Sequence, residues 1–249
     1  GTLTEELFEL SSLQSLILGG KFSGTIPTNI IRLTNLERLH LQSSGITGDF
    51  SISSMAINDE SNDSGAFGWS ETLRDLRLNV TGSTVFSTDS TMLTDLLKLT
   101  QLENLSLHSD TLAGTLPSDM PTKLANLEQL DLTLPLLRGS FPQEFWTTNG
   151  TSSSPSLHTI RLKETILIGT IILDDESKTN WKEVLISKTN SIAGMFSSHF
   201  GRMTDLRILD ITANALTGTI PSEIGLLSSL EEFKVSGNQL YGTIPSELG

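Results

Sequence analysis

Three histidines occupy matching places along this sequence and are the first candidates for metal chemistry. His40, His108 and His158 each lie in or beside a short segment in which apolar and polar residues alternate. If these segments are strands of one sheet, successive histidines are two strands apart, which is about 10 Å. Ligands of one zinc ion lie about 2.1 Å from the metal, so the three imidazoles cannot share it. We therefore predict solvated histidines, no metal site and no cofactor.

Two acidic runs are candidates for calcium binding. The first contains Asp59, Glu60 and Asp63, and the second covers residues 174–176. A calcium loop places its oxygen ligands at set intervals over about 12 residues, and neither run has that spacing. We predict two acidic loops.

Motifs of catalysis are missing from the sequence. The tripeptide Gly19-Gly20-Lys21 resembles the end of a phosphate-binding loop, but Ser15 stands where that loop has its first glycine. Neither a Gly-x-Ser-x-Gly elbow nor a His-Glu-x-x-His motif occurs. We therefore predict that the chain is not an enzyme.

The charge balance restricts the partners. The chain has 16 Lys and Arg against 29 Asp and Glu, a formal net charge of −13, and no cysteine. This charge disfavours nucleic acid and anionic membrane surfaces as partners, and the lack of thiols excludes disulfides. The most apolar stretch, residues 166–173, is too short to span a membrane.

A repeat of about 24 residues organises the whole chain. Its clearest copies begin at Leu206 and Leu230 and share the pattern LxxLxLxxNxLxGxIP. Earlier and looser copies begin at Leu13, Leu36, Leu73, Leu102, Leu127, Leu157 and Trp181. With a partial copy at residues 1–3, we count nine to ten rows, and such repetition is typical of a stacked solenoid.

The spacing within a copy predicts its local structure. The second and third apolar residues alternate with polar ones, so both point inward from a short strand. Gly218 favours a turn that a Cβ would hinder, and Pro221 suits the return path because its missing N–H costs little there. One row cannot bury its apolar side alone, so the rows must stack. We predict an α/β solenoid with one long parallel sheet.

The LxGxIP ending and the 24-residue period resemble the plant-type leucine-rich-repeat class, which includes receptor-kinase ectodomains and glycosidase inhibitors. The resemblance covers essentially the whole chain. It implies a right-handed superhelix with the long sheet on its concave face, and a location that is extracellular or at the cell surface. A fold does not determine a function, so the ligand must be argued from the surface.

We expect one domain over residues 1–249, with loop insertions near 51–71, 83–95 and 147–155, where the row spacing is long. Both ends stop within a row and lack polar caps. We therefore expect part of a longer array, with flanking repeats or end-to-end stacking. The pattern's asparagine survives mainly at Asn214 and Asn238, which predicts a less regular coil over the first six rows.

The outward positions of the sheet are the predicted surface for a protein, peptide or glycan ligand. Two basic clusters on neighbouring strands could each hold one acidic group, and the alternative is an ordinary solvated sheet of mixed charge. The predicted ligand-binding residues are Arg38, His40, Arg74, Arg77, Arg161, Lys163 and Lys182.

Four Asn-x-Ser/Thr sequons occur in the chain. Asn62, Asn79 and Asn149 are the predicted glycosylation sites, whereas a glycan on Asn104 would obstruct a strand. The first two functional hypotheses are the ligand-binding repeats of a receptor-like or secreted protein and a structural or adhesive matrix component. The third is an inhibitor of a secreted glycosidase, which reversal of Arg74 or Arg161 to Glu would disable.

Overall fold

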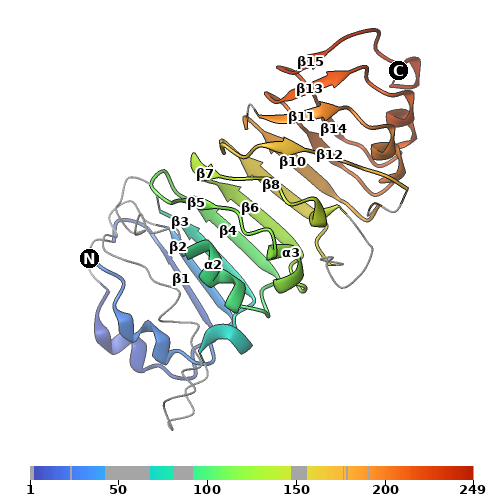
Figure 1. Ribbon diagram of the computed structural model, residues 1–249. Coiled ribbons are helices and arrows are strands. Elements are labelled where there is room, and N and C mark those ends of the chain that lie inside the picture. The colour runs from blue at the N-terminus through green and yellow to red at the C-terminus, as the bar shows by residue number, and fades with distance from the viewer. Residues whose placement is uncertain are drawn as a thin grey trace.

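Nine parallel strands stacked along the molecule form the main sheet of the computed structural model (Figure 1). The structure describes residues 3–22, 24–42, 68–80, 92–146, 156–175, 177, 179–189 and 191–248, without the side chain of Thr28. In order across the sheet, the strands are β1 (Ser15–Gly19), β2 (Arg38–Gln42), β3 (Asp75–Asn79), β4 (Asn104–His108), β6 (Gln129–Thr133), β8 (Thr159–Lys163), β10 (Glu183–Ser187), β12 (Ile208–Asp210) and β14 (Glu232–Lys234). Each begins two residues after the first apolar residue of a repeat copy, which confirms the nine predicted rows.

The register of this sheet joins equivalent positions of the repeat. Leu39 of β2 pairs with Leu76 of β3, and His40 pairs with Arg77. Leu39 and Leu76 are at most 1% exposed, whereas Arg77 points outward. This alternation puts a stack of aliphatic side chains inside the coil and polar side chains on the outer surface of the strands.

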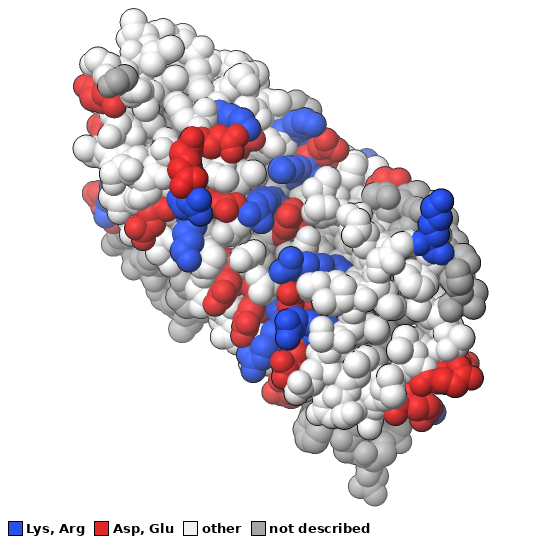
Figure 2. Space-filling view, turned by 180° about the vertical axis from the view of Figure 1, so that it is seen from behind, with Lys and Arg blue, Asp and Glu red and all other residues white. Residues whose placement is uncertain are grey.

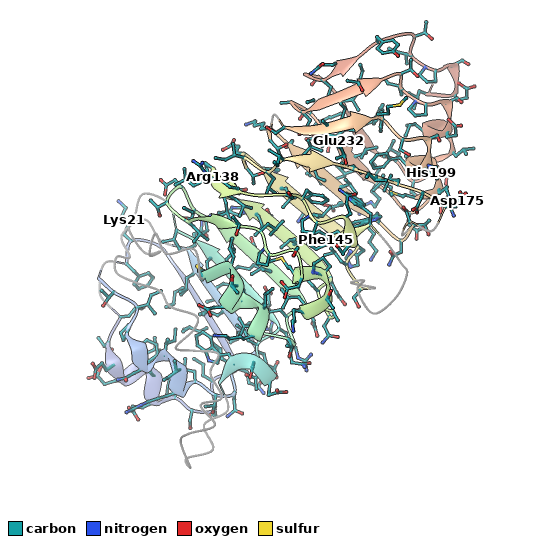
Figure 3. The ribbon with its side chains drawn as sticks, in the orientation of Figure 1. Lys21, Arg138, Phe145, Asp175, His199 and Glu232 are labelled. Carbon is teal, nitrogen blue, oxygen red and sulfur yellow. The ribbon has the colours of Figure 1, made fainter. Side chains whose placement is uncertain are left out.

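Aromatic side chains enlarge the core where the rows are least alike. The rings of Phe141 and Phe145 lie 5.7 Å apart, and those of Trp146 and Trp181 lie 4.8 Å apart. All four side chains are buried, and Phe145 can be located in Figure 3. Because each aromatic ring buries a large apolar area, this cluster fills volume that leucine alone would leave empty.

A second set of parallel strands runs across the rows, which the expectation of one long sheet missed. Its strands are β5 (Ala113–Thr115), β7 (Leu136–Arg138), β9 (Gly169–Thr170), β11 (Ile192–Met195), β13 (Ala215–Gly218) and β15 (Gln239–Leu240). β5 pairs with β7, and β9, β11, β13 and β15 form a four-stranded sheet. A bridge between Ser140 and Ile168 joins the two groups. We call this set the second ladder.

The LxGxIP segment forms both the second ladder and the return path. Gly218 has φ +88°, as its predicted turn requires. Pro221 immediately precedes η7 (Ser222–Leu226), as predicted for a return path. Most return segments are short 3-10 helices, and the two described α-helices, α2 (Met92–Asp95) and α3 (Met120–Lys123), have four residues each. The helical part of the predicted α/β solenoid is therefore small.

The edges of two expected insertions belong to the folded body. Trp69 begins η3 (Trp69–Glu71), is 1% exposed, and donates its indole N–H to the carbonyl of Leu33 at 3.1 Å. Met92 and Leu93 of α2 are also buried. The first two predicted loops therefore end too late, at residues 71 and 95, because apolar residues near those ends pack into the core. The remaining parts, 51–67, 83–91 and 147–155, lie outside the described residues.

The last four rows share a backbone feature that the two rows before them do not have. In each of these rows, the residue before the asparagine position of the pattern has a left-handed backbone conformation, with φ between 52° and 69°. These residues are Glu164, Lys188, Ala213 and Gly237. Regularity therefore begins one row earlier than the pattern of asparagines predicted.

Candidate ligand-binding face

The outward side chains of the nine main strands form one surface, which we call the sheet face; most are polar, and the apolar Ile17, Leu185 and Ile208 lie among them. Figure 2, drawn from the side opposite to Figure 1, shows basic and acidic side chains interleaved along the length of the molecule. Neighbouring strands lie about 4.8 Å apart, so outward residues on adjacent rows are within reach of one another. Their pairing decides which charges are available to a ligand.

In the first basic cluster, the carboxylate of Asp75 holds two of the predicted residues. Arg77 donates Nε to Asp75 Oδ1 at 2.9 Å and Nη2 to Oδ2 at 3.2 Å. His40 Nε2 lies 2.9 Å from Asp75 Oδ2 but out of line for a hydrogen bond. The side chain of Asp75 is only 12% exposed, so this carboxylate is well placed to orient both groups.

The second basic cluster is arranged around Arg161. Its guanidinium donates to Glu183 on β10 and lies 4.0 Å from Asp131 on β6. His108 Nε2 lies 3.1 Å from the other oxygen of the Asp131 carboxylate. The two clusters therefore share one plan, in which an aspartate on the sheet face lies between a histidine and an arginine.

The remaining predicted residues differ in whether an acidic side chain already contacts them. Arg74 forms a 2.8 Å ion pair with Glu103. Arg38, Lys163 and Lys182 form no ion pair with any described residue. The structure thus brings the predicted residues together on adjacent strands, but four of the seven already contact an acidic side chain among the described residues.

Toward the C-terminus, outward charges pair along the edge of the sheet face. Arg207 contacts Glu231 through two hydrogen bonds of 2.8 and 2.9 Å. The bonds to Arg207 lower the pKa of Glu231, and the hydrogen bond from Lys188 lowers the pKa of Glu164. These groups are exposed, so solvent screens the pairs strongly.

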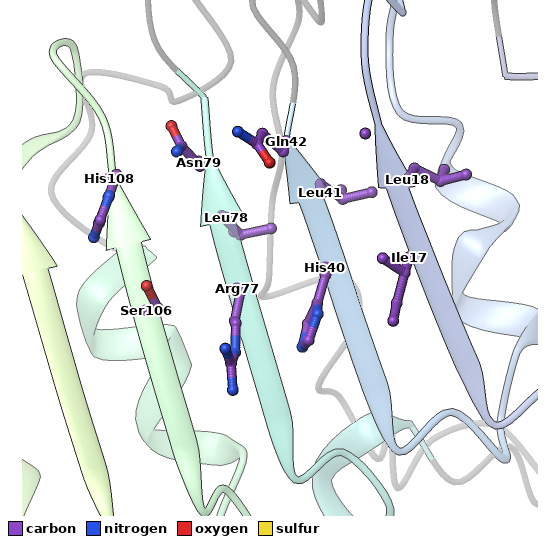
Figure 4. Close-up of a pocket in the computed structure, with 11 residues that line it drawn as sticks. Ile17, Leu18, His40, Leu41, Gln42, Arg77, Leu78, Asn79, Ser106 and His108 are labelled. Carbon is purple, nitrogen blue, oxygen red and sulfur yellow. The ribbon is translucent and has the colours of Figure 1, made fainter.

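A hollow of about 270 Å³ lies on the sheet face between β1 and β4 (Figure 4). It is present because small outward residues, Gly19 and Ser106, flank larger ones on the strands between them. Its polar lining comes from His40, Gln42, Arg77, Asn79, Ser106 and His108, and none of the described residues that line it is a carboxylate. The sequence predicted His40 and Arg77 here as ligand-binding residues. It identified His108 only as a solvated histidine and Asn79 only as a sequon, and it missed Gln42 and Ser106, whose outward register was the available signal.

The structure places two of the four sequons on the sheet face. Asn79 ends β3 and lines the hollow, and Asn104 begins β4. The other two predicted positions, Asn62 and Asn149, lie outside the described residues. A glycan on Asn79 would therefore cover the same hollow that His40 and Arg77 line.

Of the two acidic runs, the first lies outside the described residues, and in the second Asp175 contacts basic side chains. Asp175 lies 3.2 Å from Arg202 and 3.5 Å from His199, and Figure 3 labels Asp175 and His199 side by side. No group of three or more metal-ligating side chains occurs in the described ranges. None of the described helices is long and apolar enough to span a membrane.

Comparison with known proteins agrees with this architecture. The leucine-rich-repeat family matches residues 205–227, and no curated protein matches the sequence. The ectodomain of the receptor kinase GASSHO1/SCHENGEN3 from Arabidopsis thaliana, solved with CASPARIAN STRIP INTEGRITY FACTOR 2, is 26% identical with a TM-score of 0.72. That alignment covers 99% of this chain and 26% of the receptor chain.

Two further solved structures are similar. The plant peptide hormone receptor RGFR1, solved with RGF2, is 26% identical with a TM-score of 0.70, over 100% of this chain and 36% of that one. A plant ice-binding protein is 20% identical with a TM-score of 0.55, over 93% of this chain and 74% of that one. The last likeness concerns the fold alone.

The repeats, the nine-stranded sheet and these likenesses define one class. The chain is a leucine-rich-repeat protein of the plant type. It spans about a quarter of the first receptor chain and about a third of the second.

Proposed function

We propose that this chain recognises a peptide or protein ligand on its sheet face, as part of an extracellular or cell-surface protein. The observation that carries the proposal is the sheet face, with charged side chains on adjacent strands and a hollow between β1 and β4. Two similar chains, GASSHO1/SCHENGEN3 and RGFR1, are receptors solved with their named partners. A rigid sheet suits recognition because it holds side chains in place before the ligand arrives.

The test is native mass spectrometry of the purified chain mixed with the peptide fraction of the source organism's extracellular fluid. We expect a peptide adduct that is lost in the double variant Arg74→Glu and Arg161→Glu, since both side chains lie on the sheet face. Arg202→Glu is the matched control, because Arg202 contacts Asp175 away from that face. An adduct that survives the double variant, or no adduct with the unaltered chain, contradicts the proposal.

Binding to ice is a second candidate, favoured by the exposed side of the second ladder. Its segments 111–117, 136–142, 166–172, 191–197, 215–221 and 239–245 contain one charged residue, Arg138. The residue after the conserved glycine carries a hydroxyl in five of the six described segments: Thr115, Ser140, Thr170, Thr219 and Thr243. Neutral hydroxyl and methyl groups repeated on stacked strands suit a neutral, ordered water surface better than a charged ligand.

An assay of ice recrystallisation tests this second candidate. We expect the unaltered chain to slow crystal growth, and Thr219→Lys to abolish the effect by placing a charge on the second ladder. Thr133→Lys, on the sheet face, is the matched control and should retain it. Crystal growth identical to that in buffer would exclude this function.

A further inference from the structure

Two side-chain amides, those of Gln42 and Asn79, line one end of the hollow between β1 and β4 (Figure 4). They occupy paired positions of β2 and β3, so they stand on adjacent rows of the sheet face. The guanidinium of Arg77 and the ring of His40 lie toward the opposite end in the same view. The two ends of the hollow therefore offer different chemistry to a ligand.

Both amides are available to a ligand. Gln42 is exposed and Asn79 is half-buried, and neither side chain forms a hydrogen bond with another described residue. Each side-chain amide has two N–H donors and one carbonyl acceptor. The group that best complements such a pair both donates and accepts, as another carboxamide does.

A glycine leaves open space beside these amides. Gly19 on β1 pairs with Gln42, and a Cβ added at Gly19 would meet nothing within 4 Å. Ile17, two residues earlier on the same strand, is 61% exposed and forms an apolar wall of the hollow. A glutamine or asparagine side chain of a ligand has CH₂ groups that suit this wall and an amide that suits the polar end.

The charges around the hollow disfavour an ionised ligand group. Arg77 is the only Lys or Arg among the described lining residues, and Asp75 accepts two hydrogen bonds from it. The two histidines of the lining each lie beside an aspartate, Asp75 or Asp131. An ionised group that enters without a partner of opposite charge loses hydration that the hollow does not replace.

We propose that the hollow binds a primary carboxamide of the peptide ligand, an inference that rests on the proposed recognition function. The N–H groups of Gln42 and Asn79 donate to the carbonyl oxygen of that carboxamide, and their own carbonyl oxygens accept from its N–H groups. The aliphatic part of the ligand group packs against Ile17. A primary carboxamide can be a glutamine or asparagine side chain or the amidated C-terminus of a peptide, and the test separates these two sources.

Four synthetic glycine-rich peptides with acetylated N-termini test the site. Three end in a methylamide and carry glutamine, glutamate or methionine at one central position. The fourth is the methionine peptide with a primary amide at its C-terminus. Binding is followed by NMR of the side-chain N–H signals of Gln42 and Asn79. Asn35 and Asn126 serve as internal references, because their amides donate to backbone carbonyls away from the hollow.

We expect at least one of the two peptides with a primary carboxamide to shift the Gln42 and Asn79 signals. That peptide should bind roughly tenfold more tightly than the glutamate peptide and the methionine methylamide, because these lose two hydrogen bonds to the hollow. The reference signals should stay in place.

Three variants of the chain complete the test. Gln42→Met removes one amide and should weaken binding of the better peptide about tenfold. Gly19→Ile should abolish binding, because its side chain fills open space that a Cβ enters without a clash. The control Gln129→Met removes an outward glutamine of β6 that does not line the hollow, and it should leave binding unchanged.

Three results would overturn the carboxamide site. These are equal binding of all four peptides, unmoved Gln42 and Asn79 signals with both primary carboxamides, and equal losses in the Gln42 and Gln129 variants. A natural peptide that binds the unaltered chain, Gln42→Met and Gly19→Ile alike would refute the hollow while leaving recognition by the sheet face intact.

Discussion

The last four rows of the solenoid and the first five solve the same stacking problem in different ways. In the eighth row, Asn214 donates to the carbonyls of Ile186 and Ile211 at 2.6 and 3.2 Å, so one side chain links the seventh and eighth rows. Asn238 repeats this contact one row later, with Ile211 and Val235. In the fourth row, the hydroxyl of Ser109 accepts from the backbone N–H groups of Thr111 and Leu112 and lies 3.3 Å from the Thr111 hydroxyl, all within its own row.

The two regions therefore differ in the regularity of their backbone and in the shape of their outward surface. The asparagine-linked rows are uniform, and the outward charges described there pair with one another. Among the described residues of the first five rows, asparagine links occur at another position of the repeat, from Asn35 to the carbonyl of Ser11 and from Asn126 to that of Thr100. The unequal outward side chains of these rows leave the hollow.

The largest expected effect is on the uniform rows. A Cβ on Gly201 would lie 2.3 Å from the backbone oxygen of Glu223 in the next row, so Gly201→Ala must push two rows apart. We expect the free energy of unfolding to fall by roughly 4 kcal/mol, measured by urea unfolding with circular dichroism. Gly19→Ala is the control from the first row, where a Cβ would meet nothing within 4 Å. Equal stability of the two variants would contradict the close packing of these rows.

The next effect concerns the asparagine links themselves. Asn214→Ala leaves buried carbonyl groups without a donor, so the free energy of unfolding should fall by about 2–3 kcal/mol. Thr165 holds the equivalent position two rows earlier, and its buried hydroxyl has no hydrogen-bond partner among the described residues. Thr165→Val should therefore leave stability unchanged or raise it by up to about 1 kcal/mol. Urea titrations of the two variants measure both changes. A larger loss of stability in Thr165→Val than in Asn214→Ala would contradict this prediction.

The smallest effect is on the exposed ion pairs of the last rows. The hydrogen bonds from Arg207 lower the pKa of Glu231, so NMR titration should place it below the ordinary glutamate value. Because the folded pKa is the lower one, any stability from this pair is present above the unfolded pKa and is lost as the pH falls through the folded value. Arg207→Gln should return the Glu231 pKa toward its ordinary range. A pKa that the variant leaves in place would show that the pair does not form in solution.

Much of the main sheet could be predicted from the sequence because the apolar residues that recur with the repeat are the ones that become buried. Leu206, Leu209 and Ile211 identify a strand and its inward side without any tertiary information. The second ladder could not be predicted in this way, since Gly218 and its equivalents read as turns and glycine is a poor strand former. Those strands form because the main sheet stacks the rows and brings the segments together.

Only part of the candidate site could be predicted from the sequence, because its shape depends on contacts between rows. Charged types in outward positions pointed to Arg77 and His40, but the sequence alone did not show that Asp75 would hold both. The hollow depends on side-chain size in two directions, along a strand and across strands. Gly19 and Ser106 leave it open, and the sequence alone does not show that two such small residues flank larger ones across four strands.

The central claim is that the sheet face of the first rows is the recognition surface. Its most direct test is a hydrogen-exchange footprint of the chain with and without the peptide recovered by native mass spectrometry. We predict slower exchange over β2, β3 and β4, with the second ladder unchanged. Protection confined to β9, β11, β13 and β15, with no change over β2 to β4, would contradict the account.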